Sequence, residues 1–222
     1  MTALLGYHAA LLLRSQRWLA PAVLYGALLA VGVSMGDPVL DSLGYAAAAL
    51  LPVTAWLVRV CATQEPAAAR HCVVAATAPW RAQLACLLTA SGAAALLGLA
   101  GTIVTVVLAD AHNTDGTVAV PVPGALASGL LAAAVCTLTG AAVGALCTWP
   151  VQRSRGLSMA LMCLATLLVA VLAGSPAQDA ISSLITGSRT GSVPLSPLPL
   201  AAALLAAAAA AGVSCGLSAR RG

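Results

Sequence analysis

The sequence predicts an all-α integral membrane protein with six transmembrane helices in a single domain. Of its 222 residues, 61% are hydrophobic and only 7% are charged, whereas a soluble domain averages about 25% charged residues. The charges divide the chain into six uncharged stretches of 17 to 37 residues. A spanning helix requires about 20 apolar residues, so each stretch holds one span and no sizeable soluble domain remains.

The first element, residues 1–17, is apolar but too short to span the membrane before the next apolar stretch begins. It contains Tyr7 and His8 and ends in a pair of arginines, Arg14 and Arg17. Aromatic and basic residues on a short apolar helix are typical of a helix that lies in the membrane interface. The alternative is a frayed extension of the first span.

The apolar stretches give the six expected spans. Their approximate bounds are 18–36, 42–60, 82–109, 122–148, 157–174 and 197–217. Two shorter segments lie between them. Residues 63–80 form a short cytoplasmic helix between the second and third spans. Residues 175–196 precede the sixth span, either as a short re-entrant helix dipping back into the outer leaflet or as a surface loop.

The signs of the charges give the orientation. Six spans place both termini on one side, and nine of the ten arginines fall on that side: Arg14, Arg17, Arg59, Arg70, Arg81, Arg153, Arg155, Arg220 and Arg221. Five acids fall opposite: Asp37, Asp41, Asp110, Asp115 and Asp179. The positive-inside rule then predicts a multi-pass plasma-membrane protein with both termini in the cytoplasm. The four Trp residues support the same registers, because all stand at the expected cytoplasmic ends of spans.

Several chemistries are excluded by what the spans lack. No Asp, Glu, Arg or His falls in the middle of an expected span, which argues against a proton- or sodium-coupled transporter and against an intramembrane metalloenzyme. The chain has no Lys, so it has no conventional phosphate-binding loop for ATP. Its seven Cys form no cluster with metal-ligand spacing. We therefore expect no catalytic residue, metal or cofactor in this chain, and lipid and protein partners rather than nucleic acid.

The segment 63–80 carries the only acid of the cytoplasmic side, Glu65. Pro66 suits a first helical turn, where its missing N–H would be unpaired anyway. Thr63 or Glu65 is placed to cap that turn, and Pro79 is expected to end the helix. The result is a short polar-ended helix that suits a groove on another protein.

The stretch AWLVRVCATQEPAAARHCVVAATAPWRAQLA, together with the order of elements along the chain, resembles the type-2 family of ABC transporter permeases, which have the type V exporter fold. The resemblance implies that residues 63–80 are a coupling helix that docks on a separate ATPase subunit, where ATP and Mg²⁺ would bind. It also implies a second permease copy or a homologous permease, and export of a hydrophobic or amphipathic substrate.

On this reading, the residues that contact the ATPase are Glu65, Pro66, Ala69, Arg70, His71 and Val73, with Arg59 and Arg81 as supporting ion-pair residues. We expect Glu65 to pair with Arg70 or Arg81. The alternative for Glu65 is a helix cap with an exposed ion pair. The alternative for the whole chain is a non-transporting anchor or sensor subunit of a membrane complex.

Overall fold

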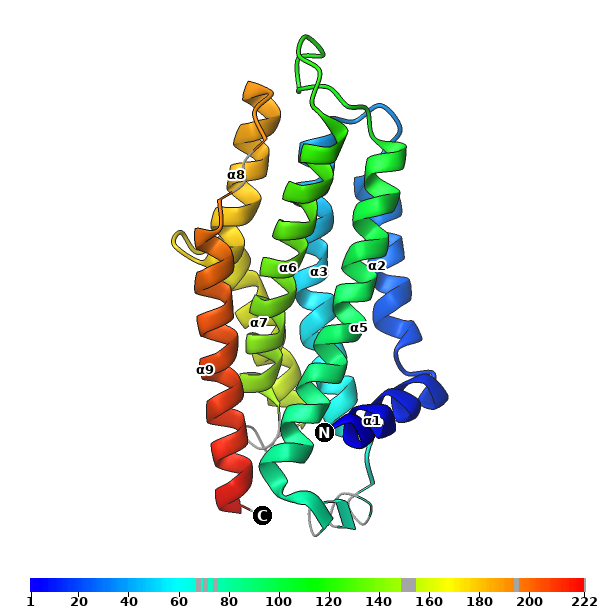
Figure 1. Cartoon of the computed structure of the whole chain (residues 1–222), viewed down its shortest axis with the longest axis vertical. Helices are drawn as coiled ribbons and strands as arrows, with labels where there is room; N and C mark the ends of the chain where they lie inside the picture. Colours follow the sequence, from blue (N-terminus) through cyan, green and yellow to red (C-terminus); the bar gives the residue numbers. More distant parts are fainter. Residues whose placement is uncertain (67–68, 70–71, 74–75, 149–154, 194–195, 222) are drawn as a thin grey trace.

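The computed structural model describes residues 1–66, 69, 72–73, 76–148, 155–193 and 196–221. Within this part, the chain is helical apart from its connections and two isolated β-bridges. Figure 1 shows the helices as an elongated bundle with one helix lying across an end. The helices are α1 (Thr2–Ser15), α2 (Leu19–Gly32), α3 (Val39–Thr63), α5 (Pro79–Leu108), α6 (Val122–Cys147), α7 (Arg155–Val171), α8 (Pro176–Thr190) and α9 (Leu198–Arg221). The predicted all-α membrane class is confirmed.

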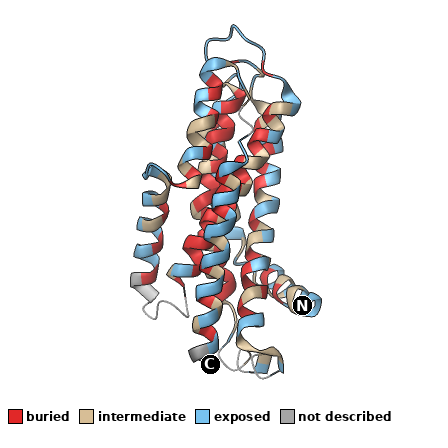
Figure 2. Ribbon diagram, turned by 60° about the vertical axis from the view of Figure 1, so that its left-hand side comes forward, coloured by how far each residue is buried: buried red, intermediate tan, exposed pale blue. Residues whose placement is uncertain are grey.

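Helices α3 and α6 form the centre of the bundle. They pack against each other, and each also contacts α5, α7 and α8. Small residues of α6 allow the close approach: a Cβ built on Gly140 would lie 2.6 Å from the Leu51 carbonyl oxygen, and one on Gly144 would lie 2.8 Å from the Cβ of Val58. The small-xxx-small pattern of α6 is therefore used within the chain. Figure 2 shows the buried residues gathered where the helices meet.

The described helices support four or five of the six predicted spans. Four described helices are long and apolar enough to cross a membrane, namely α3, α5, α6 and α9, and a fifth span results if α7 and α8 count as one bent pass. Helix α2 has only 14 residues, about 21 Å at 1.5 Å per residue, against a hydrocarbon core of about 30 Å. It ends early because Val33 is extended and Gly36 has a φ of +92°, so residues 33–38 leave the helix.

The segment before α9 is helical, so the surface-loop alternative is wrong, while the re-entrant helix stays a prediction. Residues 176–190 form a full helix, α8, that follows α7 after a short break with a bend of 45°. Ser175 caps it by accepting a hydrogen bond from the backbone N–H of Gln178. Three of its apolar residues, Ala177, Ala180 and Leu184, are buried in the same core as α3 and α6. It is therefore a packed part of the bundle and not a surface loop.

Helix α1 is separate from α2, because Gln16 between them adopts a left-handed conformation with φ +53°. The frayed-extension alternative is therefore wrong. Helix α1 packs against α5, and Leu12 joins a cluster with residues of α3, α5, α6 and α9. Figure 1 shows α1 lying across the bundle at the end where both termini lie, called here the terminal end. The opposite end, called the outer end, carries the connections between α2 and α3 and between α5 and α6.

Candidate partner-docking site

The predicted docking segment lies at the terminal end, between α3 and α5 (Figure 1). Its described residues Ala69, Cys72, Val73, Ala76 and Thr77 have helical backbone. The Thr77 hydroxyl donates to the Val73 carbonyl at 2.7 Å, which is the bond of a regular helical turn. Two of the predicted contact residues, Arg70 and His71, lie outside the described residues.

The ends of this segment differ from the sequence prediction. Thr63 does not cap the next helix: it is the last residue of α3, and its hydroxyl donates back to the Arg59 carbonyl at 2.8 Å. Pro79 does not end a helix but begins α5, where its fixed φ and missing N–H fit the first helical position. The break falls one residue earlier, at Ala78, which has a φ of +118°. This conformation is strained for a residue with a side chain.

The other predicted contact residues differ in exposure. Pro66 is exposed, whereas Glu65, Ala69 and Val73 are partly buried. Glu65 lies beside the hydroxyl of Tyr7 on α1. Burial first and then the neighbouring Glu65 carboxylate raise the pKa of that hydroxyl. Tyr7 also meets the ring of His8 edge-on, with ring centroids 5.4 Å apart. Helix α1 thus reaches the first residues of the docking segment.

Arg59 on α3 and Arg81 on α5 flank the segment. The Arg59 guanidinium Nη1 donates to the Ser158 Oγ at 2.6 Å, and Ser158 in turn donates to the Cys147 carbonyl. One hydroxyl therefore joins the terminal ends of α3, α6 and α7. The Arg81 guanidinium lies over the Trp80 ring, 5.2 Å from its centroid, in a cation–π arrangement. The pairing of Glu65 with Arg70 or Arg81 stays a prediction.

Sequence reasoning missed Tyr7 and Ser158 as members of this site. Tyr7 was used only as a sign of an interfacial helix, and Ser158 stands in sequence 99 residues from Arg59. No local pattern connects residues so far apart. The sequence held one signal for Tyr7. An interfacial helix lies at the level of the loops on its own side of the membrane, so α1 is expected near the polar segment 63–80.

The described residues hold no group of three or more His, Cys, Asp or Glu suited to a metal ion. All seven Cys are free thiols. At the terminal end the described docking segment carries helical backbone and the Glu65 carboxylate, with Arg59 and Arg81 on the adjoining helices.

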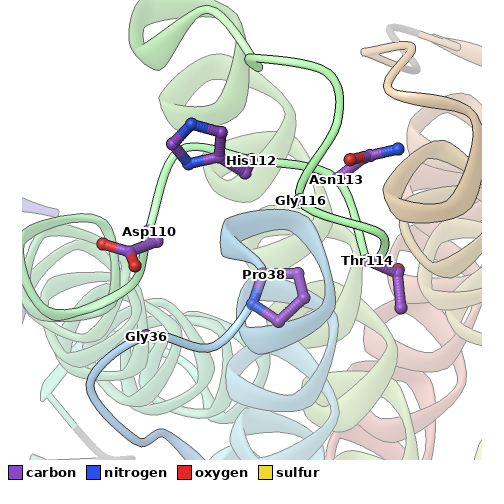
Figure 3. Close-up of a pocket in the computed structure, with 7 residues that line it drawn as sticks. All are labelled: Gly36, Pro38, Asp110, His112, Asn113, Thr114 and Gly116. Atoms are coloured by element: carbon purple, nitrogen blue, oxygen red, sulfur yellow. The ribbon is translucent and has the colours of Figure 1, made fainter.

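Two hollows lie at the outer end. The one drawn in Figure 3 has a volume of about 250 Å³ and is lined by residues of the 36–38 turn and the 110–116 loop, including Asp110 and His112. The second has a volume of about 420 Å³ and lies between α2, α3 and α8. Comparison with protein families, with curated proteins and with solved structures finds no match for this chain.

Proposed function

We propose that this chain is the membrane subunit of an ATP-driven ABC exporter that uses a separate ATPase subunit. The observation that carries the proposal is the joint at the terminal end, where a short segment with helical residues from Ala69 onward connects two long apolar helices and Glu65 lies beside Tyr7 of α1. An ATPase that pushes on this segment would move α3 and α5, which it joins, and α1, which packs on α5.

The same proposal assigns the orientation and the number of spans. The terminal end faces the cytoplasm, because the arginines concentrate there and the aspartates lie toward the other end. Helix α2 then serves as a short first span completed by residues 33–38, with local thinning of the bilayer. The α7–α8 pair is the fifth span and α9 the sixth.

The interpretation has one competitor, a non-transporting anchor or sensor subunit. Both functions need a docking surface, but only the exporter requires an ATPase whose turnover depends on the segment. Co-expression with an ATPase that carries the phosphate-binding motif GxxxxGK[ST], encoded beside this chain, separates the two. The exporter predicts a stable complex and ATP hydrolysis that is stimulated by the membrane subunit in proteoliposomes.

The decisive variants change the charge at the joint. We expect Glu65→Ala to reduce ATPase stimulation by about tenfold, which corresponds to about 1.4 kcal/mol. The matched control is Asp115→Asn, which removes an exposed carboxylate at the outer end. Charge swaps of Glu65 with Arg81, and of Glu65 with Arg70, test which arginine is its partner, since the true pair regains activity when both charges are exchanged. If the protein purifies alone and no ATPase stabilises it, the exporter proposal is wrong.

A further inference from the structure

The larger hollow at the outer end has the size of a ligand site. Its volume is about 420 Å³, within the range of about 300–1,000 Å³ that is usual for small-molecule pockets. It lies where the end of α2, the first turns of α3 and the outward half of α8 meet. Its lining residues are Gly32, Asp37, Pro38, Asp41, Ser42, Gly44, Tyr45, Ala48, Ile181 and Ile185.

Two carboxylates give this cavity its charge. The Asp37 side chain is fixed in place, because its Oδ2 accepts a hydrogen bond from the Ser34 backbone N–H at 2.8 Å. Its backbone carbonyl also accepts one from the Asp110 N–H at 3.0 Å. Asp41 lies four residues further along the chain, exposed in the first turn of α3. The described lining contains no basic residue, so the charge that complements it is positive.

The remaining walls are aromatic and aliphatic. The Tyr45 ring lies directly against Gly32, where an added Cβ would come within 2.0 Å of the ring carbon Cε1. Only glycine at position 32 lets the ring occupy this place. Ile181 and Ile185 face the cavity from α8, one helical turn apart. These surfaces suit an apolar body, and an aromatic face also attracts a cation.

Ser42 supplies an independent sign of a polar ligand. It is only 3% exposed and lines the cavity. Several buried hydroxyls of the bundle donate to a carbonyl one turn back in their own helix, as Thr54 does to Leu50 and Thr102 does to Gly98, whereas the buried Thr105 hydroxyl has no partner among the described residues. The Ser42 hydroxyl has no such partner among the described residues. The Ser42 oxygen is reachable from the cavity, since it is not among the fully buried unpaired atoms, so a ligand N–H can donate a hydrogen bond to it.

The simplest competing explanation assigns Asp41 only to the stabilisation of the α3 N-terminus, where an acid is favourable. That role requires neither the unpaired Ser42 hydroxyl nor the apolar wall opposite. An amphipathic organic cation uses all three features, because its charge meets the carboxylates, its N–H groups reach Ser42 and its body lies between Tyr45 and α8.

We propose that this cavity binds an amphipathic organic cation, namely an amine-bearing aromatic or aliphatic molecule. The inference narrows the substrate class of the proposed exporter, and as a transport site it rests on that proposal. Binding itself is independent of any ATPase and is measured on this chain alone.

The experiment measures ethidium fluorescence with the full-length protein in nanodiscs of neutral phosphatidylcholine. Ethidium is a fluorescent aromatic cation that carries amino groups. We expect saturable binding that tetraphenylphosphonium, an apolar cation, displaces. Triphenylphosphine oxide has a similar phenyl body but no charge and is expected not to compete. Empty nanodiscs give the partition of the dye into lipid.

Variants assign the binding to this cavity. We expect Asp41→Asn to raise the Kd for ethidium at least tenfold, Ala48→Leu to weaken binding by filling the cavity, and Ser42→Ala to raise the Kd a few-fold. Asp115→Asn removes the same charge outside the cavity and is expected to leave the Kd unchanged. Monodispersity and thermal unfolding of each variant establish that it is folded.

The proposal is overturned if the wild-type protein shows no saturable ethidium binding, or if Asp41→Asn, Ala48→Leu and Asp115→Asn bind alike. Displacement by triphenylphosphine oxide as strong as that by tetraphenylphosphonium would also overturn it, because it would reveal an apolar site without charge selection. If ethidium binds as expected but no ATPase forms a complex with this chain on co-expression, the cation site stands and the exporter proposal is wrong.

Discussion

The two ends of the bundle are held together by different kinds of bonds. At the outer end the connections are joined mainly through the backbone: Val39 N–H donates to the Asp110 carbonyl at 3.1 Å, and Thr114 N–H donates to the Ser188 carbonyl at 3.0 Å. At the terminal end the described long-range contacts run through side chains, from Arg59 to Ser158 and from Glu65 to Tyr7.

The difference suits the two roles that we propose. Backbone bonds fix the shape of a connection whatever its side chains do, so the outer end presents a preformed cavity. Side-chain contacts between separate helices exchange partners without unfolding a helix, so the terminal end is the part that responds to a docked partner. The comparison predicts that substitutions at one end leave the other end unchanged.

The largest effect is expected from Ser158→Ala at the terminal end. Ser158 is 3% exposed, and its loss removes one acceptor from the Arg59 guanidinium and one donor from the Cys147 carbonyl. We expect the free energy of local unfolding at this end to fall by about 2 kcal/mol. Hydrogen exchange of peptides from the terminal ends of α6 and α7 measures this change. The control is Ser128→Ala, which is equally buried and whose hydroxyl bonds only within its own helix. Equal effects of the two variants would contradict a special role for the Arg59–Ser158 contact.

A smaller effect is expected from Asn113→Ala at the outer end. The Asn113 Oδ1 accepts from the backbone N–H of Thr117 at 2.8 Å and of Val118 at 3.1 Å. Because both of these residues are exposed, water replaces part of the lost bonding. We expect the loop of residues 110–120 to open about tenfold more often, which corresponds to about 1.4 kcal/mol less free energy of opening. The measurement is the hydrogen-exchange rate of these residues. Asn113→Asp keeps the acceptor and is the control. Faster exchange at the terminal end would contradict the independence of the two ends.

The fold class followed from composition because a chain this apolar has too few polar residues to cover a soluble surface. The limits of the elements were harder to predict because local signals were ambiguous. A proline both ends and begins helices, and Pro79 begins one. The polar positions of α8, including Ser182 and Ser183, hid an apolar face made of Ala177, Ala180 and Leu184.

The candidate sites were less predictable than the fold. Glu65 was identified because it is the one acid on the side where the sequence places nine arginines, which is a property of the sequence. The cavity at the outer end was not, because it combines Asp41 and Tyr45 of α3 with Ile181 and Ile185 of α8. Its chemistry appears only after the bend between α7 and α8 brings these helices together.

The smallest effect is expected from Tyr7→Phe, and its size depends on pH. Burial and the Glu65 carboxylate raise the pKa of Tyr7 in the folded protein, so folding favours the protonated hydroxyl. This contribution is fully present below the unfolded pKa of about 10 and is lost as the pH rises through the folded value. Tyr7 is 37% exposed, so solvent screening keeps the contribution of this contact below about 1 kcal/mol. We therefore expect the wild-type Tm to fall more steeply than that of Tyr7→Phe above pH of about 10, with the two curves nearly parallel at lower pH. Parallel curves throughout would mean that α1 and Glu65 are not coupled through this hydroxyl, and the side-chain account of the terminal end would then rest on Arg59 and Ser158.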